Sequence, residues 1–241
     1  GFGRLADLYA GYEQVILFDY SVSQLEYARQ RLGDERFVYV AGDLYRLPLA
    51  TNAVDSAVMV RVLHHIAAVP EALSQISRVL CPQGLFVLEF ANKRHLKNIL
   101  RSLLPGSVNP FDPQPYEFAK LHFDFHPTWV AERLAAAGFH TEARRSVSIL
   151  RAGLLKRTIP TGTLAAADRA IQWLTTPLAL GPSIFTSNRL SKPGATELAL
   201  PAELFRCPSC GHEPLTRRDN RTFCAACQGH WPIENGVYVF K

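Results

Sequence analysis

Apolar residues in the first ninety positions fall into short continuous runs that alternate with helix-spaced stripes. QVILFDY and FVYVA are continuous runs, which is typical of strands covered on both faces. Residues 21–33 and 69–80 instead carry apolar side chains at helical spacing. This alternation predicts an α/β fold with a doubly wound parallel sheet.

Two long segments, 93–126 and 152–181, interrupt the alternation and are predicted insertions. The first combines a short basic amphipathic helix with a proline-rich loop and closely spaced aromatic residues, so we expect it to cover a substrate as a lid. The second contains a predicted helix near 163–175, whose apolar stripe is expected to cap the core, with a partner surface as the alternative. The stripe consists of Leu164, Ala167, Ile171 and Leu174.

Glycines and acidic residues stand where the first elements meet. Gly1, Gly3 and Ala6 match G-x-G-x-x-A and lead into a predicted helix that starts near residue 4, while Asp19 and Asp43 close the first two strands. Glycine allows a close approach of the backbone to a ligand, and a carboxylate at a strand end can accept hydrogen bonds from both hydroxyls of a ribose. The pattern predicts a nucleotide-type site, although capping or turn chemistry is an alternative role for both acids.

The order of the next motifs resembles class I S-adenosylmethionine (SAM) methyltransferases. These motifs are FVYVAGD, DSAVMVRVLHHI and the helix EALSQISRVL that leads through CPQG into LFVLEF. The resemblance implies a seven-stranded Rossmann-like sheet. That family usually carries G-x-G-x-G, so GFGR resembles the second half of its motif. Its first strand and first glycine would lie upstream of residue 1, so we expect the chain to be a fragment of a longer protein, with an unusual sheet that closes the gap as the alternative.

The resemblance also implies which residues would hold SAM. Asp19 would bind the ribose hydroxyls, Asp43 and the Leu44 backbone would contact the adenine, and Arg61 would flank the methionine part. The predicted cofactor-binding set is Gly1, Gly3, Asp19, Tyr20, Asp43, Leu44 and Arg61.

Histidines provide the candidate catalytic groups. His64 and His65 follow the strand AVMV, and His126 lies at the end of the first insertion. An imidazole there could accept a proton from a methyl acceptor, or it could only hydrogen-bond the backbone. The lid residues that could surround an acceptor, or pack the lid onto the sheet, are Tyr116, Phe118, His122, Phe123, Phe125 and His126.

The formal charge of +5 is unevenly distributed. Residues 91–160 contain eleven Lys or Arg residues and five acidic residues, an excess of six positive charges. Such a region attracts nucleic acid, phosphorylated substrates or an acidic membrane surface, but the dispersed charges also fit a solvated face. No apolar run reaches about 18 residues, so no transmembrane segment is predicted.

Four of the five cysteines form C-x2-C-x13-C-x2-C, namely Cys207, Cys210, Cys224 and Cys227. Two such pairs provide four thiolates for a closed tetrahedral shell, which predicts structural Zn²⁺; a redox dithiol or an iron–sulfur site is the alternative. Cysteines used this way fit a reducing compartment, so a cytoplasmic location is predicted. Cys81 remains as an inert thiol.

The predicted organisation is a methyltransferase domain at 1–190, a linker at 191–203 and a zinc ribbon at 204–241. CQGHWPIENGVYVF resembles the zinc-ribbon proteins that activate eukaryotic tRNA and release-factor methyltransferases. In that group the ribbon binds a methyltransferase partner, so here it could cover an apolar face of its own catalytic domain.

The predicted function is SAM-dependent methyl transfer, with a small-molecule acceptor favoured by the aromatic lid. The ribbon and the basic region suit an RNA or protein acceptor as the alternative. A non-catalytic scaffold is the alternative from another class, and a nicotinamide-dependent oxidoreductase is the weaker enzymatic one. The sequence does not specify the oligomeric state.

Overall fold

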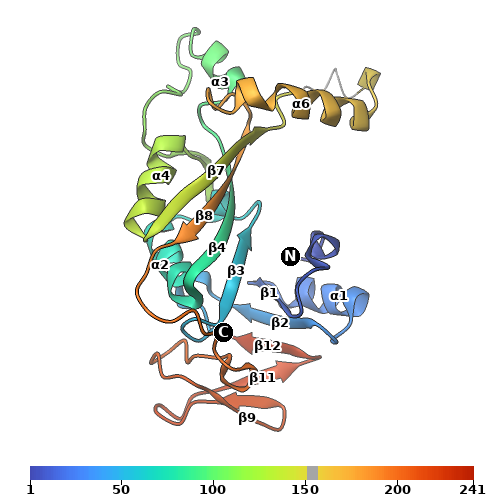
Figure 1. Ribbon diagram of the computed structural model, residues 1–241, viewed down its shortest axis with the longest axis vertical. Coiled ribbons are helices and arrows are strands. Elements are labelled where there is room, and N and C mark those ends of the chain that lie inside the picture. The colour runs from blue at the N-terminus through green and yellow to red at the C-terminus, as the bar shows by residue number, and fades with distance from the viewer. Residues whose placement is uncertain (151–156) are drawn as a thin grey trace. The chain divides into compact units, whose positions relative to one another are not determined.

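The computed structural model describes residues 1–150 and 157–241 (Figure 1). Residues 152–156 of the second predicted insertion therefore lie outside the described part. The chain divides into two compact units. Unit 1 contains Gly1–Ala53 and Glu197–Lys241, and unit 2 contains Val54–Thr196. The domain boundaries at 190 and 204 remain a prediction.

A six-stranded sheet forms the centre of unit 1, in the order β1-β2-β12-β11-β10-β9. The first three strands are parallel to one another, since β2 pairs with β1 on one side and with β12 on the other. The last three continue as an antiparallel meander. The strands are β1 (Val15–Asp19), β2 (Phe37–Gly42), β9 (Thr216–Arg218), β10 (Arg221–Phe223), β11 (His230–Glu234) and β12 (Val237–Phe240).

The helices of unit 1 are short. They are η1 (Ala6–Tyr9), α1 (Val22–Leu32), η2 (Leu44–Arg46) and η4 (Pro201–Glu203). The hydroxyl of Ser21 accepts a hydrogen bond from the Gln24 N–H at the start of α1, and Gly33 ends this helix with φ of 74°. The helix expected from residue 4 is only the 3-10 turn η1, because Leu5 offers no side chain to cap its first N–H groups.

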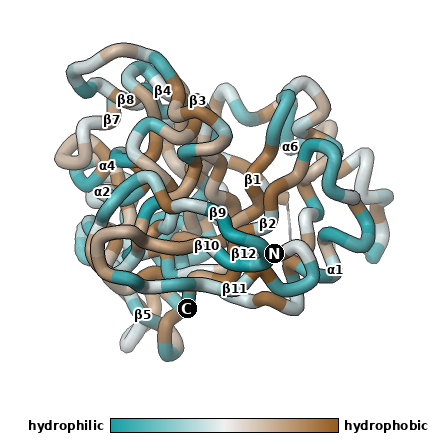
Figure 2. Tube along the Cα trace, turned by 90° about the horizontal axis from the view of Figure 1, so that it is seen from below, coloured by the Kyte–Doolittle hydropathy of each residue, from teal (hydrophilic) through white to brown (hydrophobic). Residues whose placement is uncertain are grey.

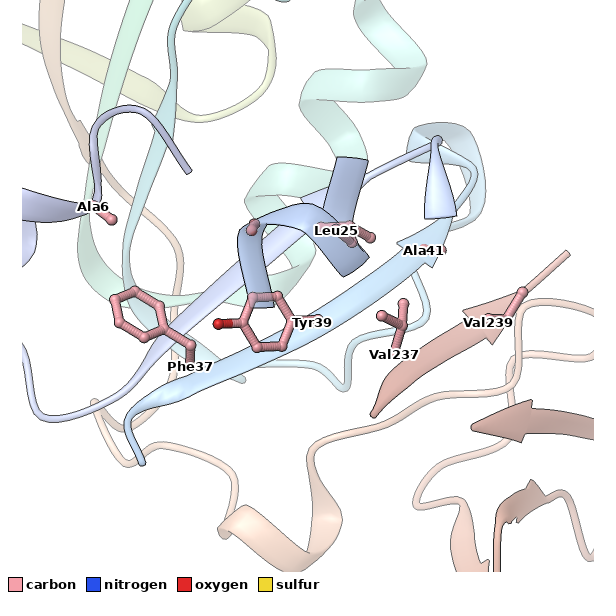
Figure 3. Close-up of a cluster of buried hydrophobic side chains, with 8 residues drawn as sticks. Ala6, Leu25, Phe37, Tyr39, Ala41, Val237 and Val239 are labelled. Carbon is pink, nitrogen blue, oxygen red and sulfur yellow. The ribbon is translucent and has the colours of Figure 1, made fainter. Parts of the chain in front are cut away.

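Both faces of β2 are buried, as its continuous apolar run predicted. Phe37, Tyr39 and Ala41 belong to a cluster with Leu25 of α1 and with Val237 (Figure 3). The side chains between them point to the opposite face, where Val38 and Val40 join ribbon residues in a second cluster. The ribbon members of that second cluster are Phe205, Cys207, Leu215, Cys224, Trp231, Tyr238 and Phe240.

The C-terminal ribbon therefore covers both an edge and a face of β2. The hydropathy along the chain follows this burial, since the tube in Figure 2 is hydrophobic along β1 and β2 and hydrophilic along β9. An edge strand of this composition would otherwise be open to pairing with other chains. Ribbon residues thus pack on an apolar face of β1 and β2, while the expectation that this face belongs to a catalytic domain stays a prediction.

Unit 2 contains a four-stranded sheet in the order β3-β4-β8-β7. β3 is parallel to β4, whereas β8 is antiparallel to both β4 and β7. A separate hairpin is formed by β5 and β6. The strands are β3 (Val54–Met59), β4 (Leu80–Ala91), β5 (Tyr116–Ala119), β6 (His122–Asp124), β7 (Phe139–Val147) and β8 (Ser183–Leu190).

The helices of unit 2 follow the predicted pattern. They are η3 (Leu63–His65), α2 (Val69–Val79), α3 (Leu96–Arg101), α4 (Pro127–Ala136) and α6 (Thr161–Thr175). The apolar stripe expected on α6 is only partly buried: Leu164 is buried, but Ala167 and Leu174 are exposed. The stripe is not fully buried because α6 also uses the polar residue Asp168 for its contacts. The Asp168 carboxylate accepts hydrogen bonds from the backbone N–H groups of Ser148 and Ile149.

A single seven-stranded sheet is not confirmed. Among the described residues, β1 pairs with β2 alone and β3 with β4 alone, so each strand ends its own sheet. Within residues 1–150 and 157–241, no helix has the length and apolarity required to cross a membrane.

Candidate functional site

Two acidic residues meet at one edge of the unit 1 sheet. Asp19 is the last residue of β1 and pairs with Ala41, while Asp43 directly follows β2. Because β1 and β2 are parallel, their carboxyl ends lie at the same edge. The structure thus brings the two predicted ligand-binding acids to one rim, and their role in binding stays a prediction.

Each acid also stabilises the turn that follows it. The Asp19 carboxylate accepts the Ser21 N–H at 2.8 Å and contacts the Gly1 nitrogen. The Asp43 carboxylate accepts the Tyr45 N–H at 2.9 Å and so caps η2. A carboxylate has about four acceptor positions, so these bonds leave capacity for the hydroxyl or amino groups of a ligand.

The backbone conformation and the close packing at residue 3 both require glycine. Its φ is 72°, and a Cβ there would lie 2.7 Å from the Leu32 side chain. The guanidinium of Arg31 donates hydrogen bonds to the carbonyls of Phe2 and Gly3. No motif in the sequence had singled out Arg31. Tyr20 is exposed beside this rim.

In unit 2, Arg61 occupies a constrained backbone position after β3. Its φ is 59°, and its N–H donates to the Glu89 carboxylate at 2.8 Å. Glu89 is buried on β4. This contact gives the buried Glu89 carboxylate a hydrogen-bond donor. It does not test the predicted role of Arg61 beside the methionine part of SAM.

Three imidazoles gather in unit 2. His64 and His65 lie on η3, and His122 comes from the β5–β6 hairpin; the ring centroids are 3.9 Å apart for His64 and His65, and 4.7 Å apart for His65 and His122. Burial, followed by the neighbouring His65, lowers the pKa of His64. Phe118 lies against His122 with centroids 5.8 Å apart.

The hydrogen bonds of this cluster assign the tautomers of two rings. Nδ1 of His65 is 3.2 Å from the Leu121 carbonyl oxygen, and Nδ1 of His122 is 2.9 Å from the Lys120 carbonyl oxygen. A carbonyl only accepts, so each Nδ1 carries the hydrogen. In the neutral ring Nε2 is then the proton acceptor.

His126 has a structural explanation. It is the N-cap of α4, and its Nδ1 accepts the Thr128 N–H at 3.3 Å. Burial lowers its pKa, as does the nearby charge of Arg94. We therefore regard His126 as the weakest of the three catalytic candidates.

The lid is fastened by a lysine that the sequence reasoning had counted as surface charge. Lys93 is 2% exposed, and its ammonium donates to the carbonyls of Asp112 and Gln114 at 2.9 and 2.7 Å. Phe125 is also buried and stacks on Trp129, whereas Phe118 is half exposed. Of the aromatic residues in the predicted lid, Phe125 therefore packs in the interior, whereas Phe118 remains partly accessible to solvent.

Four thiols converge in the C-terminal ribbon. The sulfur atoms of Cys207, Cys210, Cys224 and Cys227 all lie within 4.8 Å of one another. Two of the separations are 3.6 Å. Zn–S bonds of about 2.3 Å in a tetrahedron require sulfur separations of about 3.8 Å, so the cluster fits a four-coordinate ion.

Backbone turns shape both halves of the metal site. Gly211 N–H donates to the Cys207 carbonyl, and Gln228 N–H donates to the Cys224 carbonyl. Burial opposes ionisation of Cys224, but backbone N–H groups of Cys227 and Ala226 outweigh it and lower the pKa to about 7. The remaining cysteine, Cys81, is buried in β4, and burial raises its pKa, in agreement with an inert thiol.

The metal site is connected to the rim of unit 1. Ala50 N–H donates to the Leu204 carbonyl at 2.8 Å, and Arg206 N–H donates to the Pro48 carbonyl at 3.0 Å. Phe240 pairs with Gly42, the residue before Asp43. The ribbon therefore holds the chain on both sides of Asp43.

Comparison with known proteins agrees with the fold. Residues 1–88 match the family model described as a methyltransferase domain. The chain is 33% identical over 131 residues to a demethylmenaquinone methyltransferase of Chlamydia pneumoniae, an alignment that covers 49% of this chain and 57% of that protein. This chain thus spans little more than half the length of that relative.

Solved structures show the same architecture. An S-adenosylmethionine dependent methyltransferase from Mesorhizobium loti aligns with a TM-score of 0.56 and 20% identity, over 78% of this chain and 87% of the other. A complex of the Haloferax volcanii Trm112 methyltransferase activator with a putative methyltransferase aligns with a TM-score of 0.55 and 16% identity, over 81% and 80%. These likenesses show an α/β methyltransferase fold, and the family match supports a SAM-dependent methyltransferase.

Proposed function

We propose that this protein transfers a methyl group from SAM to a small-molecule acceptor. The observation that carries the proposal is the rim of unit 1, where Asp19 and Asp43 end paired parallel strands within the segment that matches the methyltransferase family model. The name of the Chlamydia relative, a demethylmenaquinone methyltransferase, supports a small-molecule acceptor.

Each rim residue has a distinct part in holding the donor. Asp19 accepts hydrogen bonds from the ribose hydroxyls, while Asp43 and the Leu44 backbone contact the adenine. Gly1 and Gly3 allow the backbone to approach, and Tyr20 flanks the rim. The role of Arg61, which belongs to unit 2, beside the methionine part stays a separate prediction. When bound, SAM supplies an electrophilic methyl group, so the protein has mainly to orient the acceptor and exclude water.

We assign proton acceptance to the histidine cluster. Nε2 of His65 and Nε2 of His122 are the acceptor nitrogens in their neutral rings, given the Nδ1 contacts to carbonyl oxygens. A hydroxyl or acidic carbon of the acceptor loses a proton during methyl transfer, and a neutral imidazole can take it. The lowered pKa of His64 keeps that ring neutral down to more acidic pH.

We further propose that the four cysteines hold structural Zn²⁺. All four ligands are protein thiolates, so no position remains for water or substrate. The ion would stabilise the ribbon, which pairs with β2 of the same chain. This arrangement supports a structural role for the ribbon over a role in capturing an RNA or protein acceptor.

Calorimetric titration with SAM tests the proposal. Asp19→Asn keeps an oxygen for the Ser21 N–H but removes the charge, so we expect about 10- to 100-fold weaker binding, from the ~1.5–3 kcal/mol of a hydrogen bond to a charged group. Glu35→Gln is the matched control, because Glu35 is exposed and lies just before the opposite end of β2.

Two results would contradict the assignment. Equal SAM affinity of Asp19→Asn and the unchanged protein would remove Asp19 from the site. Absence of any bound SAM or demethylated product on the purified protein, together with no titration signal, would favour a non-catalytic scaffold. Mass spectrometry of the same sample measures the zinc content.

A further inference from the structure

The end of α3 and the turn after it expose a set of leucines. Leu100 is 59% exposed, Leu103 82% and Leu104 64%. These residues continue the helical spacing of α3, because the Leu104 N–H donates to the Arg101 carbonyl and keeps the turn compact. Single exposed leucines are common on proteins, but clusters of them mark docking surfaces.

The C-terminal end of α6 exposes a second set. Trp173 is 76% exposed, and Leu174 and Leu178 are about half exposed. The Leu96 N–H donates to the Leu180 carbonyl at 2.9 Å, so the start of α3 lies directly against the segment that follows α6 (Figure 1). We call these six residues the α3/α6 surface: Leu100, Leu103, Leu104, Trp173, Leu174 and Leu178.

Positive charge borders the α3/α6 surface. Lys97 and Arg101 lie one helical turn apart on α3, and both are exposed. Neither forms an ion pair with any residue in the described part of the chain. Burial, and then the charges of Lys97 and Arg101, lower the pKa of His95.

The combination identifies one kind of partner. Nucleic acid would neutralise the cations but leave the leucines in water, and a second copy of the chain would bring like charges together. Exposed leucines and a tryptophan beside cations instead match segments that lie in the interface of an anionic bilayer. We propose that the α3/α6 surface binds the surface of an anionic phospholipid membrane.

Co-sedimentation of the full-length protein with vesicles tests this inference without donor or acceptor. We expect at least about tenfold stronger binding to phosphatidylcholine vesicles that contain about one third phosphatidylglycerol than to pure phosphatidylcholine. Binding should fall as the salt concentration rises from about 0.1 to 0.5 M, because exposed charges are then screened.

Two variant pairs separate the apolar and the charged contributions. Leu103→Glu combined with Leu104→Glu should weaken vesicle binding at least about tenfold. Leu200→Glu is the control, because Leu200 is also exposed, at 62%, but lies in unit 1. This variant should bind vesicles as tightly as the unchanged protein. Lys97→Glu combined with Arg101→Glu should weaken vesicle binding to a similar extent. Arg221→Glu, a charge reversal in unit 1, is the control and should leave vesicle binding unchanged.

Several outcomes would overturn the proposal. Equal binding to neutral and anionic vesicles, or equal losses in variants and controls, would exclude this surface. Tight binding of bulk RNA that persists in the leucine variant would make it a nucleic-acid surface. A dimer in sedimentation that the leucine variant dissociates, without vesicle binding, would make it a contact between copies.

Discussion

Replacing Val237 by alanine tests whether the ribbon and residues 1–53 form one cooperative unit. Val237 belongs to the ribbon in sequence, but it is fully buried in the cluster of α1 and β2. The change removes two methyl groups, worth about 1.6 kcal/mol at ~0.8 kcal/mol each. The cavity left behind brings the expected loss of unfolding free energy to about 2–3 kcal/mol.

The size of unit 1 converts this energy into a temperature. Gly1–Ala53 and Glu197–Lys241 together contain 98 residues, 53 and 45. For a domain of this size, 1 kcal/mol shifts the melting temperature by about 4–8 °C, so we expect the unfolding of unit 1 to shift down by about 8–24 °C. Val58→Ala is the control, because Val58 is 44% exposed on β3 in unit 2 and should change stability far less.

Two measurements together test the coupling between the ribbon and β2: zinc release, and hydrogen exchange followed by mass spectrometry. Release of the proposed zinc ion on heating, measured with a chromogenic chelator, reports unfolding of the ribbon, and hydrogen exchange of the β2 amides reports unfolding of residues 37–42. We expect both to change together in Val237→Ala. Earlier zinc release with unchanged protection of β2 would refute the reasoning, because the ribbon would then unfold independently of the strand beside it.

Three further predictions concern the metal, one glycine and the histidines. Removal of the proposed zinc ion with a chelator should unfold unit 1, as measured by circular dichroism, and added zinc should restore the folded spectrum. Binding of a structural zinc ion supplies about 10–16 kcal/mol, so an unchanged spectrum after loss of the metal would contradict this. Gly3→Ala should lower the unfolding free energy by at least about 1–2 kcal/mol, since its φ is 72° and Leu32 is too close, whereas Gly162→Ala, with open space around it, should not. The folded pKa of His64 is lowered, so its contribution to stability is present above the unfolded pKa of about 6.5 and is lost as pH falls through the folded value. His64→Asn should therefore flatten the loss of melting temperature between about pH 7.5 and 5.5, and an identical slope would contradict the assignment.

Local patterns in the chain determined most individual elements of this protein. The strands at the continuous apolar runs, β1 and β2, and the helices at the apolar stripes, α1 and α2, all appear where they were predicted. The spacing of the cysteine pairs predicted the convergence of four thiols, because each C-x-x-C turn directs its two sulfur atoms locally. Asp19 and Asp43 share a rim because parallel neighbouring strands must end at the same edge.

Tertiary structure alone decided what each element contacts. The pairing of β12 with β2 joins residues about two hundred positions apart, and no local pattern specifies such a partner. His122 reaches His65, and buried Lys93 fastens the lid, because loops fold back onto the sheet by contacts whose energy depends on three-dimensional packing. For the same reason the sequence overestimated the burial of α6, and the single seven-stranded sheet that the resemblance implies is not confirmed. Periodicity shows which side chains share a face, but only the folded chain determines what covers that face.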